Sequence, residues 1–172
     1  AKGDVLWQCS GLTDNAIPCP IVDDGVAYCM TGYQGFSLLA VPISGKGDQA
    51  GKTLWKRERG TPYVPSPVLY DGLLYFTQSN QAILSCVDAK TGSILIERTR
   101  LPGLSNVYAS LVGAGNHVYV MGRYGKTTVL KRTGKFELVA TNHLEDRFDA
   151  SPAVAGDQLF LRGHRFLYCI GK

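Results

Sequence analysis

The sequence predicts an all-β fold, a β-propeller made of four-stranded antiparallel blades, and three observations support this prediction. A hairpin pattern occurs four times, its copies recur at a blade-like spacing, and strand-like segments follow each copy. The 172 residues are 45% hydrophobic and include 20 glycines, a composition that can fill a core and supply many turns. We therefore expect one domain, residues 1–172, with four blades' worth of strands.

The hairpin pattern is clearest in SPVLYDGLLYF, residues 66–76, where Asp-Gly separates two short apolar runs. The other copies are CPIVDDGVAYC from residue 19, SLVGAGNHVYV from residue 110 and SPAVAGDQLFL from residue 151. The four starts are 47, 44 and 41 residues apart, a spacing typical of propeller blades and not of helical solenoids. An aromatic residue stands nine positions after each start and is expected to pack between blades: Tyr28, Tyr75, Tyr119 and Phe160.

Two further strands are predicted in each repeat. The third strands are FSLLAV, AILSCVD, TTVLK and RFLYCI. In three repeats a turn with glycine then leads to a fourth, outer strand: GKTLWKRE, DAKTGSILIER and TGKFELVA. A large apolar residue four positions after the glycine is expected to seal one blade against the next: Trp55, Ile96 and Leu138.

The two ends of the chain are irregular. The last repeat, residues 147–172, lacks a fourth strand, whereas the chain begins with KGDVLW, which matches GKTLW with Trp7 in place of Trp55. Because an unpaired blade edge is prone to association, residues 1–12 are expected to supply the outer strand of a last blade, with Trp7 as a further packing residue. The remaining expected blades are residues 13–60, 61–103 and 104–146.

Three arrangements can use this N-terminal strand, and the sequence leaves all three open. The strand can close a four-bladed ring within one chain. It can pair with the last blade of a second chain, so that a homodimer forms one eight-bladed ring. The chain can also be a piece of a longer propeller.

The turn and outer-strand pattern, seen in DAKTGSILI and AKGDVLW, resembles the tryptophan-docking repeat of the pyrroloquinoline-quinone-like (quinoprotein-type) β-propeller family. The resemblance covers nearly the whole chain. The family includes quinoprotein dehydrogenases, a propeller lipoprotein of the outer-membrane barrel-assembly machinery and other secreted bacterial proteins. Since its members usually have about eight blades, this chain resembles half of an eight-bladed propeller. The resemblance also implies a periplasmic or secreted location.

The resemblance specifies the fold and leaves enzymatic activity uncertain, because the docking motif is a packing device. The family's dehydrogenases carry adjacent cysteines over the quinone, together with Glu, Asn and Asp ligands to calcium. The five cysteines here are isolated, at 9, 19, 29, 86 and 169, so that role transfers to no position. We predict no catalytic residue, no cofactor and no metal site. A fragment of a pyrroloquinoline-quinone-dependent oxidoreductase remains the alternative.

Charge and motifs argue against several other functions. The formal net charge is +4 and the basic residues are scattered, so a nucleic-acid partner is not indicated. No apolar run is long enough for a membrane span. A zinc site is not indicated, because Cys-x-x-Cys is absent and the three histidines are dispersed. Cys9 and Cys19, which flank the first inter-blade loop, are the one pair worth testing for a disulfide.

The predicted function is therefore that of a non-catalytic propeller scaffold, which binds an unknown protein or polymer partner. In propellers the loops from one outer strand to the next inner strand converge on one face. Here these loops are residues 10–18, 57–65, 100–109 and 141–150. Their tyrosine, arginine and amide side chains suit partner contact. The candidate binding residues are Asn15, Tyr63, Asn106, Tyr108, Asp146, Arg147 and Asp149.

Overall fold

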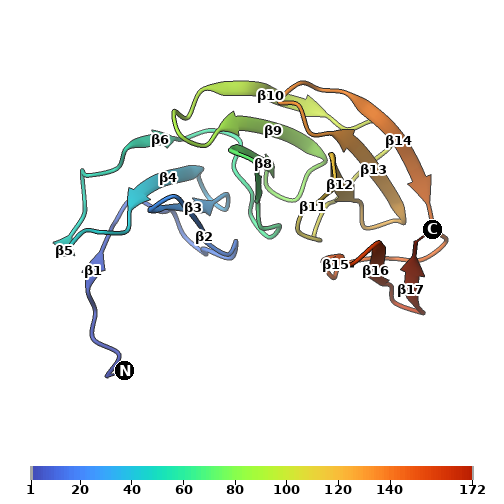
Figure 1. The fold of residues 1–172 in the computed structure, drawn as a ribbon, viewed down its shortest axis with the longest axis horizontal. Helices are drawn as coiled ribbons and strands as arrows, with labels where there is room; N and C mark the ends of the chain where they lie inside the picture. The colour runs from blue at the N-terminus through green and yellow to red at the C-terminus, as the bar shows by residue number, and fades with distance from the viewer. Residues whose placement is uncertain (1, 172) are drawn as a thin grey trace.

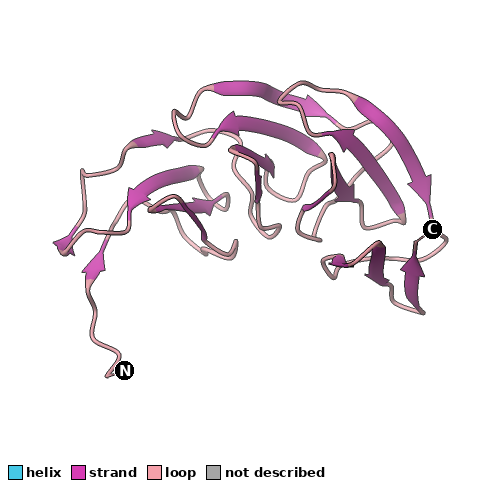
Figure 2. Cartoon of the chain, in the orientation of Figure 1, coloured by secondary structure: helices cyan, strands magenta, loops and turns pink. Residues whose placement is uncertain are grey.

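A computed structural model describes residues 2–171 of the chain. Within these residues there are seventeen strands, β1 to β17, and no helix, which confirms the all-β prediction (Figure 2). The blade sheets follow one another along an open arch, and the two chain ends lie at opposite ends of it (Figure 1). No helix in the described part of the chain could therefore cross a membrane.

Three blades have four antiparallel strands each, in sequence order apart from the short β5. Blade one consists of β2 (Ile21–Asp23), β3 (Val26–Thr31), β4 (Ser37–Pro42) and β6 (Trp55–Arg57). Blade two consists of β7 (Val68–Tyr70), β8 (Leu73–Thr77), β9 (Ile83–Asp88) and β10 (Ile94–Arg100). Blade three consists of β11 (Val112–Ala114), β12 (His117–Met121), β13 (Lys126–Lys131) and β14 (Leu138–His143).

The repeated hairpin of the sequence forms the two inner strands of each blade. In blade two, Tyr70 pairs with Leu73 and encloses Asp71 and Gly72 as a two-residue turn. The φ angles of Asp71 and Gly72 are +55° and +74°, the left-handed values that a tight hairpin turn requires at both central positions. Asp-Gly is the residue pair that adopts these angles at least cost, which explains why the strand changes direction there.

Blade four is a three-stranded sheet of β15 (Ala153–Ala155), β16 (Gln158–Arg162) and β17 (Leu167–Ile170). The N-terminal strand does not lie on it. Instead β1 (Trp7–Gln8) pairs in parallel with β5 (Gly47–Asp48), a short strand between β4 and β6. Within the described residues 2–171 of one chain, residues 2–12 therefore do not complete blade four and no four-bladed ring closes, because the arch holds β1 and β17 at its two ends (Figure 1).

The hydrophobic core lies between the blades. Tyr28, Met30 and Leu38 of blade one pack with Leu74 and Phe76 of blade two. The joint between blades two and three is larger and includes Tyr75, Leu84, Cys86, Val118, Val120 and Leu130. The joint between blades three and four is smaller and centres on Ala109, Met121, Phe148 and Leu161. Burial between neighbouring sheets, and not within one sheet, thus stabilises the arch.

Polar contacts reinforce the first two joints. The Tyr28 hydroxyl and the Trp55 indole each donate a hydrogen bond to the carbonyl oxygen of Ala89 at 3.0 Å. The Tyr75 hydroxyl accepts one from the amide of Gly134 at 3.1 Å. The corresponding aromatics of the later blades, Tyr119 and Phe160, are only partly buried.

A series of hydrogen bonds connects the first residues of the four repeats, and we call it the serine series. The amide of Cys19 donates to Ser66 Oγ at 2.9 Å, that of Ser66 to Ser110 Oγ at 3.0 Å, and that of Ser110 to Ser151 Oγ at 3.0 Å. Each inner strand is thereby fixed to the next one along the arch. All five cysteines are free thiols, so Cys9 and Cys19 form no disulfide.

Candidate binding face

The loops between blades and the turns between second and third strands form one continuous surface, the loop face, because backbone hydrogen bonds join them. At the first joint the amide of Ser79 donates to Thr61 at 2.8 Å. At the second joint the amide of Arg123 donates to Asn106 at 2.8 Å. At the third joint the amide of His164 donates to Arg147 at 2.9 Å. Loop and turn thus hold each other in place, so the backbone of this face is fixed.

At the blade-one end of the loop face, two tyrosines lie together. The rings of Tyr33 and Tyr63 stack with centroids 4.8 Å apart, and the Asn15 side-chain amide donates to the Tyr63 hydroxyl at 2.8 Å. Asn15 and Tyr33 are exposed, and Tyr63 is half-buried. This arrangement offers a flat aromatic surface beside a polar amide.

In the middle of the face, arginines lie over tyrosine rings. The Arg123 guanidinium is 4.5 Å from the Tyr108 ring centroid, and that of Arg147 is 5.4 Å from the Tyr124 ring. Tyr124 is 52% exposed and Arg147 is also exposed. Such pairs hold the long arginine side chains in place and still leave their charge accessible.

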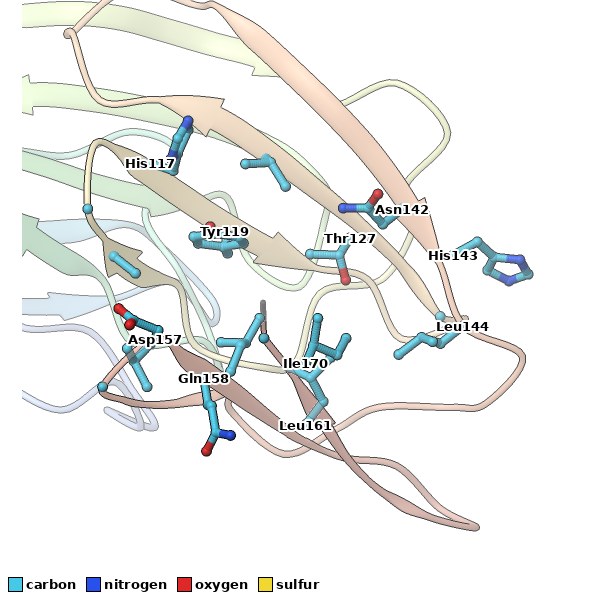
Figure 3. A pocket seen from close by; sticks show the side chains of 18 residues that line it. His117, Tyr119, Thr127, Asn142, His143, Leu144, Asp157, Gln158, Leu161 and Ile170 are labelled. Carbon is cyan, nitrogen blue, oxygen red and sulfur yellow. The ribbon is translucent and has the colours of Figure 1, made fainter.

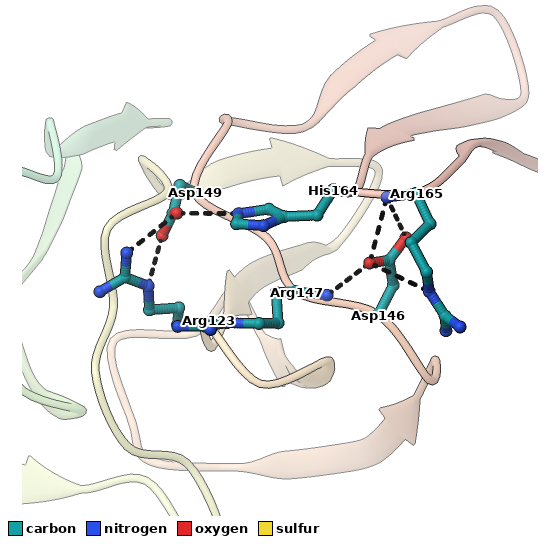
Figure 4. A network of polar contacts seen from close by, with 6 residues as sticks. All are labelled: Arg123, Asp146, Arg147, Asp149, His164 and Arg165. Atoms are coloured by element: carbon teal, nitrogen blue, oxygen red, sulfur yellow. Dashed lines mark hydrogen bonds and ion pairs between the residues drawn. The ribbon is translucent and has the colours of Figure 1, made fainter.

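Asp149 connects two blades by accepting contacts from both sides (Figure 4). Its carboxylate lies 2.8 Å from Arg123 Nε and 3.1 Å from His164 Nε2. Burial raises the pKa of the Asp149 carboxyl, but the hydrogen bonds from His164 and Arg123 and their charges outweigh burial, so the pKa is lowered overall. The carboxylate therefore stays ionised and holds Arg123 over Tyr108.

Asp146 has a different position from the other predicted binding residues. Its side chain is only 2% exposed, and it accepts hydrogen bonds from the amides of Arg147 and Arg165 and from the Tyr168 hydroxyl. Burial raises the pKa of this carboxyl, but these donors together lower it overall. Asp146 thus fastens the turn of blade four to the preceding loop (Figure 4) and has no free oxygen to offer a partner.

A cavity of about 1040 Å³ lies away from these residues, between blades three and four (Figure 3). His117, Tyr119 and Asn142 line it from blade three, and Gln158 and Ile170 line it from blade four. Aromatic side chains and a tight turn fill the corresponding joints earlier in the arch. The cavity is therefore an unfilled blade joint and not an enclosed pocket on the loop face.

Among residues 2–171, no group of three or more His, Cys, Asp or Glu side chains is arranged to hold a metal ion. The chemistry that the loop face does offer is recognition by exposed arginines, aromatic rings and amides. Of the residues predicted from sequence, Tyr108 and Asp149 come together around Arg123, and Arg147 lies against the neighbouring Tyr124. Asn15 and Tyr63 lie together at the other end of the face. The backbone carbonyl of Asn106 accepts a hydrogen bond from the backbone amide of Arg123.

Four contributors were missed from sequence: Tyr33, Arg123, Tyr124 and His164. They lie on the turns between second and third strands, whereas all the candidates predicted from sequence lie on loops between blades. The signal was available, because both kinds of connection emerge at the same end of a four-stranded antiparallel sheet.

Searches against protein-family models and against curated proteins find no match. Solved structures do match. The computationally designed Ika4 protein aligns over 98% of each chain, with 13% identity and a TM-score of 0.71. BamB from Moraxella catarrhalis aligns over 88% of this chain, with 12% identity and a TM-score of 0.62. A europium-containing methanol dehydrogenase aligns over 81% of this chain, with 14% identity and a TM-score of 0.57.

These similarities support the propeller fold. At such low identities they show fold alone and carry no activity across. The chain spans 44% of the length of BamB and 25% of that of the methanol dehydrogenase. It thus corresponds to part of each of these two proteins and to nearly all of Ika4.

Proposed function

We propose that this chain is a non-catalytic propeller scaffold that binds a protein partner through its loop face. The observation that carries the proposal is the exposed guanidinium of Arg147, which is held against the Tyr124 ring. Arginine and tyrosine are the residue types that most often dominate the binding energy of protein interfaces. Their fixed positions reduce the entropy that would be lost on binding.

The partner's chemistry follows from the charges on this face. Arg123 is already paired with Asp149, whereas no carboxylate in the described part of the chain pairs with Arg147. A partner segment that carries a carboxylate beside an apolar side chain would satisfy Arg147 and cover Tyr124. A polymer such as a glycan would instead use the Tyr33 and Tyr63 rings with Asn15, and we treat it as the competing outcome.

Site-specific photo-cross-linking in cells tests the proposal. A photoreactive amino acid at Tyr124 or Asn106 is expected to capture one protein of defined mass. The matched control position is Asn116, which is also exposed but lies in the hairpin turn at the opposite end of blade three. Equal capture from Asn116, or no capture from either loop-face position, would contradict a loop-face interface.

The arginine tests the same interface in a second way. Replacing Arg147 with Ala is expected to weaken capture by about tenfold, the usual effect of losing a hot-spot residue. Lys135→Ala removes an exposed cation from a turn at the other end of blade three and is expected to change nothing. If capture depends on Tyr33 and Tyr63 and not on Arg147, the partner is a polymer and the protein interface is wrong.

The proposal also includes a homodimer and an extracytoplasmic location. Two arches of this size would complete one eight-bladed ring, a view supported by the alignment with slightly less than half of BamB. Periplasmic or secreted location rests on the resemblance described above. Fractionation of the native host would test the location, and a cytoplasmic pool alone would refute it.

The second candidate is a fragment of a quinone-dependent oxidoreductase, and the likeness to part of a methanol dehydrogenase is the one observation that favours it. This candidate predicts that pyrroloquinoline quinone, added with calcium or europium, changes absorbance on binding and supports dye-linked alcohol oxidation. Titration of the purified chain distinguishes the two candidates, since a scaffold would bind no quinone.

A further inference from the structure

We propose that the free edge of β17, together with the cavity between blades three and four, binds residues 2–8 of a second copy of this chain. The bound segment would form the fourth strand of blade four. This inference deepens the proposed homodimer and rests on it, because it names the site through which the two arches join.

The first support is the position of Trp7. Its indole donates to the carbonyl oxygen of Ile43 at 3.0 Å, as the indole of Trp55 donates to Ala89 at 3.0 Å. Ile43 and Ala89 are equivalent, since each directly follows the third strand of its blade. Trp55 stands on the outer strand of the blade that precedes Ala89. By the same relation, β1 occupies the outer-strand position of a blade that precedes blade one.

No other strand of that preceding blade exists in the described part of the chain. Blade four has the complementary composition, with the three inner strands β15, β16 and β17 and no outer strand. A second copy would therefore supply the strands that residues 2–171 of the first copy do not provide. Its blade four would stand before blade one of the first copy, and the same contact would repeat at the other end of the ring.

The second support is the turn glycine that precedes each outer strand. In blade two the third strand ends at Asp88, which pairs with Leu73, and the corresponding register in blade four places Gly171 opposite Gln158. In blade two, Gly92 lies in the turn before the outer strand, and Gly3 stands at the corresponding place before β1. The φ angles of Gly3 and Gly92 are +77° and +73°, so both glycines have a left-handed backbone.

The third support is that β1 and β17 each have one strand edge without a hydrogen-bonded neighbour in the described chain. The carbonyls of Leu6 and Gln8 accept hydrogen bonds from Gly47 and Gln49 of the β5 segment, at 3.0 and 2.7 Å. Because backbone groups alternate in direction along a strand, those of Val5 and Trp7 face the other edge, which is open in the described chain. The strand β17 also pairs on one edge only, with β16. Open edges of this kind pair readily with another strand.

The fourth support is the unfilled joint itself. A β-carbon on Gly92 would lie 2.7 Å from the Trp55 ring, and one on Gly134 would lie 3.1 Å from Leu95, so outer strands pack against turn glycines of the next blade. Gly3 has no atom within 4 Å of the same position. On blade three, Leu138 is 46% exposed. Gly3 of a second copy, placed beside Leu138, would bury the exposed leucine side chain, and the turn around Gly3 would fill part of the cavity.

The serine series also has one unpaired group at each end in the described part of the chain, a donor at one end and an acceptor at the other. Every amide in it donates to the hydroxyl of the next repeat, so the amide of Ser151 is left at one end and the Cys19 side chain at the other. When two arches meet, the Ser151 amide would face the Cys19 thiol of the second copy. A thiol is a weaker acceptor than a hydroxyl, so Cys19→Ser is expected to tighten the dimer.

Cross-linking tests the strand register. By equivalence with Ile94↔Val87, Val5 of one copy would lie opposite Ile170 of the other. Two full-length chains are prepared in a Cys169→Ser background, one with Val5→Cys and one with Ile170→Cys. Mixing them under mild oxidation is expected to give a covalent dimer. The control replaces Val5→Cys with Leu95→Cys, an exposed site on β10, and should give none.

Solution mass and affinity complete the test. We expect a dimer mass by analytical ultracentrifugation, about tenfold weaker self-association for Val5→Pro, which removes one backbone donor, and tighter self-association for Cys19→Ser. Val5 is 81% exposed, so the folded chain should tolerate the proline. A dimer without the Val5–Ile170 cross-link would overturn the strand site and leave the homodimer standing. A monomer would overturn both and leave the loop-face capture experiment unaffected.

Discussion

The Trp55 indole donates its N–H to the carbonyl oxygen of Ala89 at 3.0 Å, so one hydrogen bond fastens the outer strand of blade one to a turn of blade two. The ring also covers Gly92, where a β-carbon would lie 2.7 Å from Trp55 Cδ2. The distance between the two blades at this joint therefore depends on Gly92, because any residue with a β-carbon would displace the Trp55 ring.

Replacing Gly92 with Ala is expected to destabilise the chain by about 3 kcal/mol. The left-handed backbone, φ +73°, costs a β-carbon about 1 kcal/mol, and the displaced Trp55 ring adds about 2 kcal/mol. Gly72→Ala is the matched control, since its φ is +74° but nothing lies within 4 Å. Denaturant unfolding measures both variants. Equal losses would show that the ring contact contributes nothing.

Tyr75 predicts a loss of stability in alkali. Burial raises the pKa of Tyr75 to about 12, and burial likewise raises the pKa of the neighbouring Cys86 thiol to about 12. The folded state keeps the Tyr75 proton at pH values where the unfolded chain, with an ordinary pKa of 10.0, has lost it. The stabilisation is thus complete below pH 10 and disappears as the pH rises through about 12.

Tyr75→Phe should therefore show a shallower fall in unfolding free energy between pH 10 and 12, measured by urea titration. At pH 7 the same variant should lose about 1 kcal/mol, because the Gly134 amide loses its acceptor. Cys86 retains its own contribution, so some alkaline loss remains. An unchanged slope would show that Tyr75 does not titrate with folding.

Asp146 predicts a loss of stability at acid pH, whereas Tyr75 predicts one at alkaline pH. Because its folded pKa is lowered, its stabilisation is present above the ordinary carboxyl pKa of 3.8 and is lost as the pH falls through the lowered folded value. Asp146→Asn should speed hydrogen exchange at the amides of Arg165 and Phe166 at neutral pH. The exposed neighbour Glu145→Gln is the control. Similar exchange in both variants would show that the carboxylate does not hold the turn.

The serine series predicts a graded response at residue 110. Ser110→Ala leaves the Ser66 amide without its acceptor and is expected to cost about 1 kcal/mol in thermal or denaturant unfolding. Ser110→Cys introduces the residue found at position 19, and its free energy of unfolding should lie between those of the unchanged chain and Ser110→Ala. Ser44→Ala, at an exposed serine, should be neutral. A neutral Ser110→Ala would remove the series as a structural element.

The repeat pattern was readable from sequence because its signals are local. Asp71-Gly72 sets a hairpin turn, and the alternation of large apolar residues around it places Tyr75 in a blade joint with no exposed surface. The periodic spacing then orders these units along the chain. Nothing beyond neighbouring residues and their repetition was needed for this part of the fold.

The candidate face was less predictable because its contacts join residues far apart in the chain. Asp146 reads as a solvated loop acid, but the backbone amides of residues 165 and 166 surround it only after blade four folds. The parallel pairing of Trp7 with Gly47 was also missed, since the insertion between β4 and β6 has no counterpart in the other repeats. A serine is repeated at three of the four aligned starts, but its hydrogen bond between blades depends on the order of the blades in space.

In the serine series each amide donates to the hydroxyl of the next repeat, from Cys19 to Ser66, from Ser66 to Ser110 and from Ser110 to Ser151, so all three hydrogen bonds run in one direction. The arch therefore has an unlike head and tail, and in the proposed dimer the head of one copy would meet the tail of the other. Such joints end growth when the curvature returns the second tail to the first head, and otherwise they continue into a helical fibre. A substitution that opens one blade joint, even far from the termini, would change that curvature and is therefore expected to favour filaments over the closed dimer.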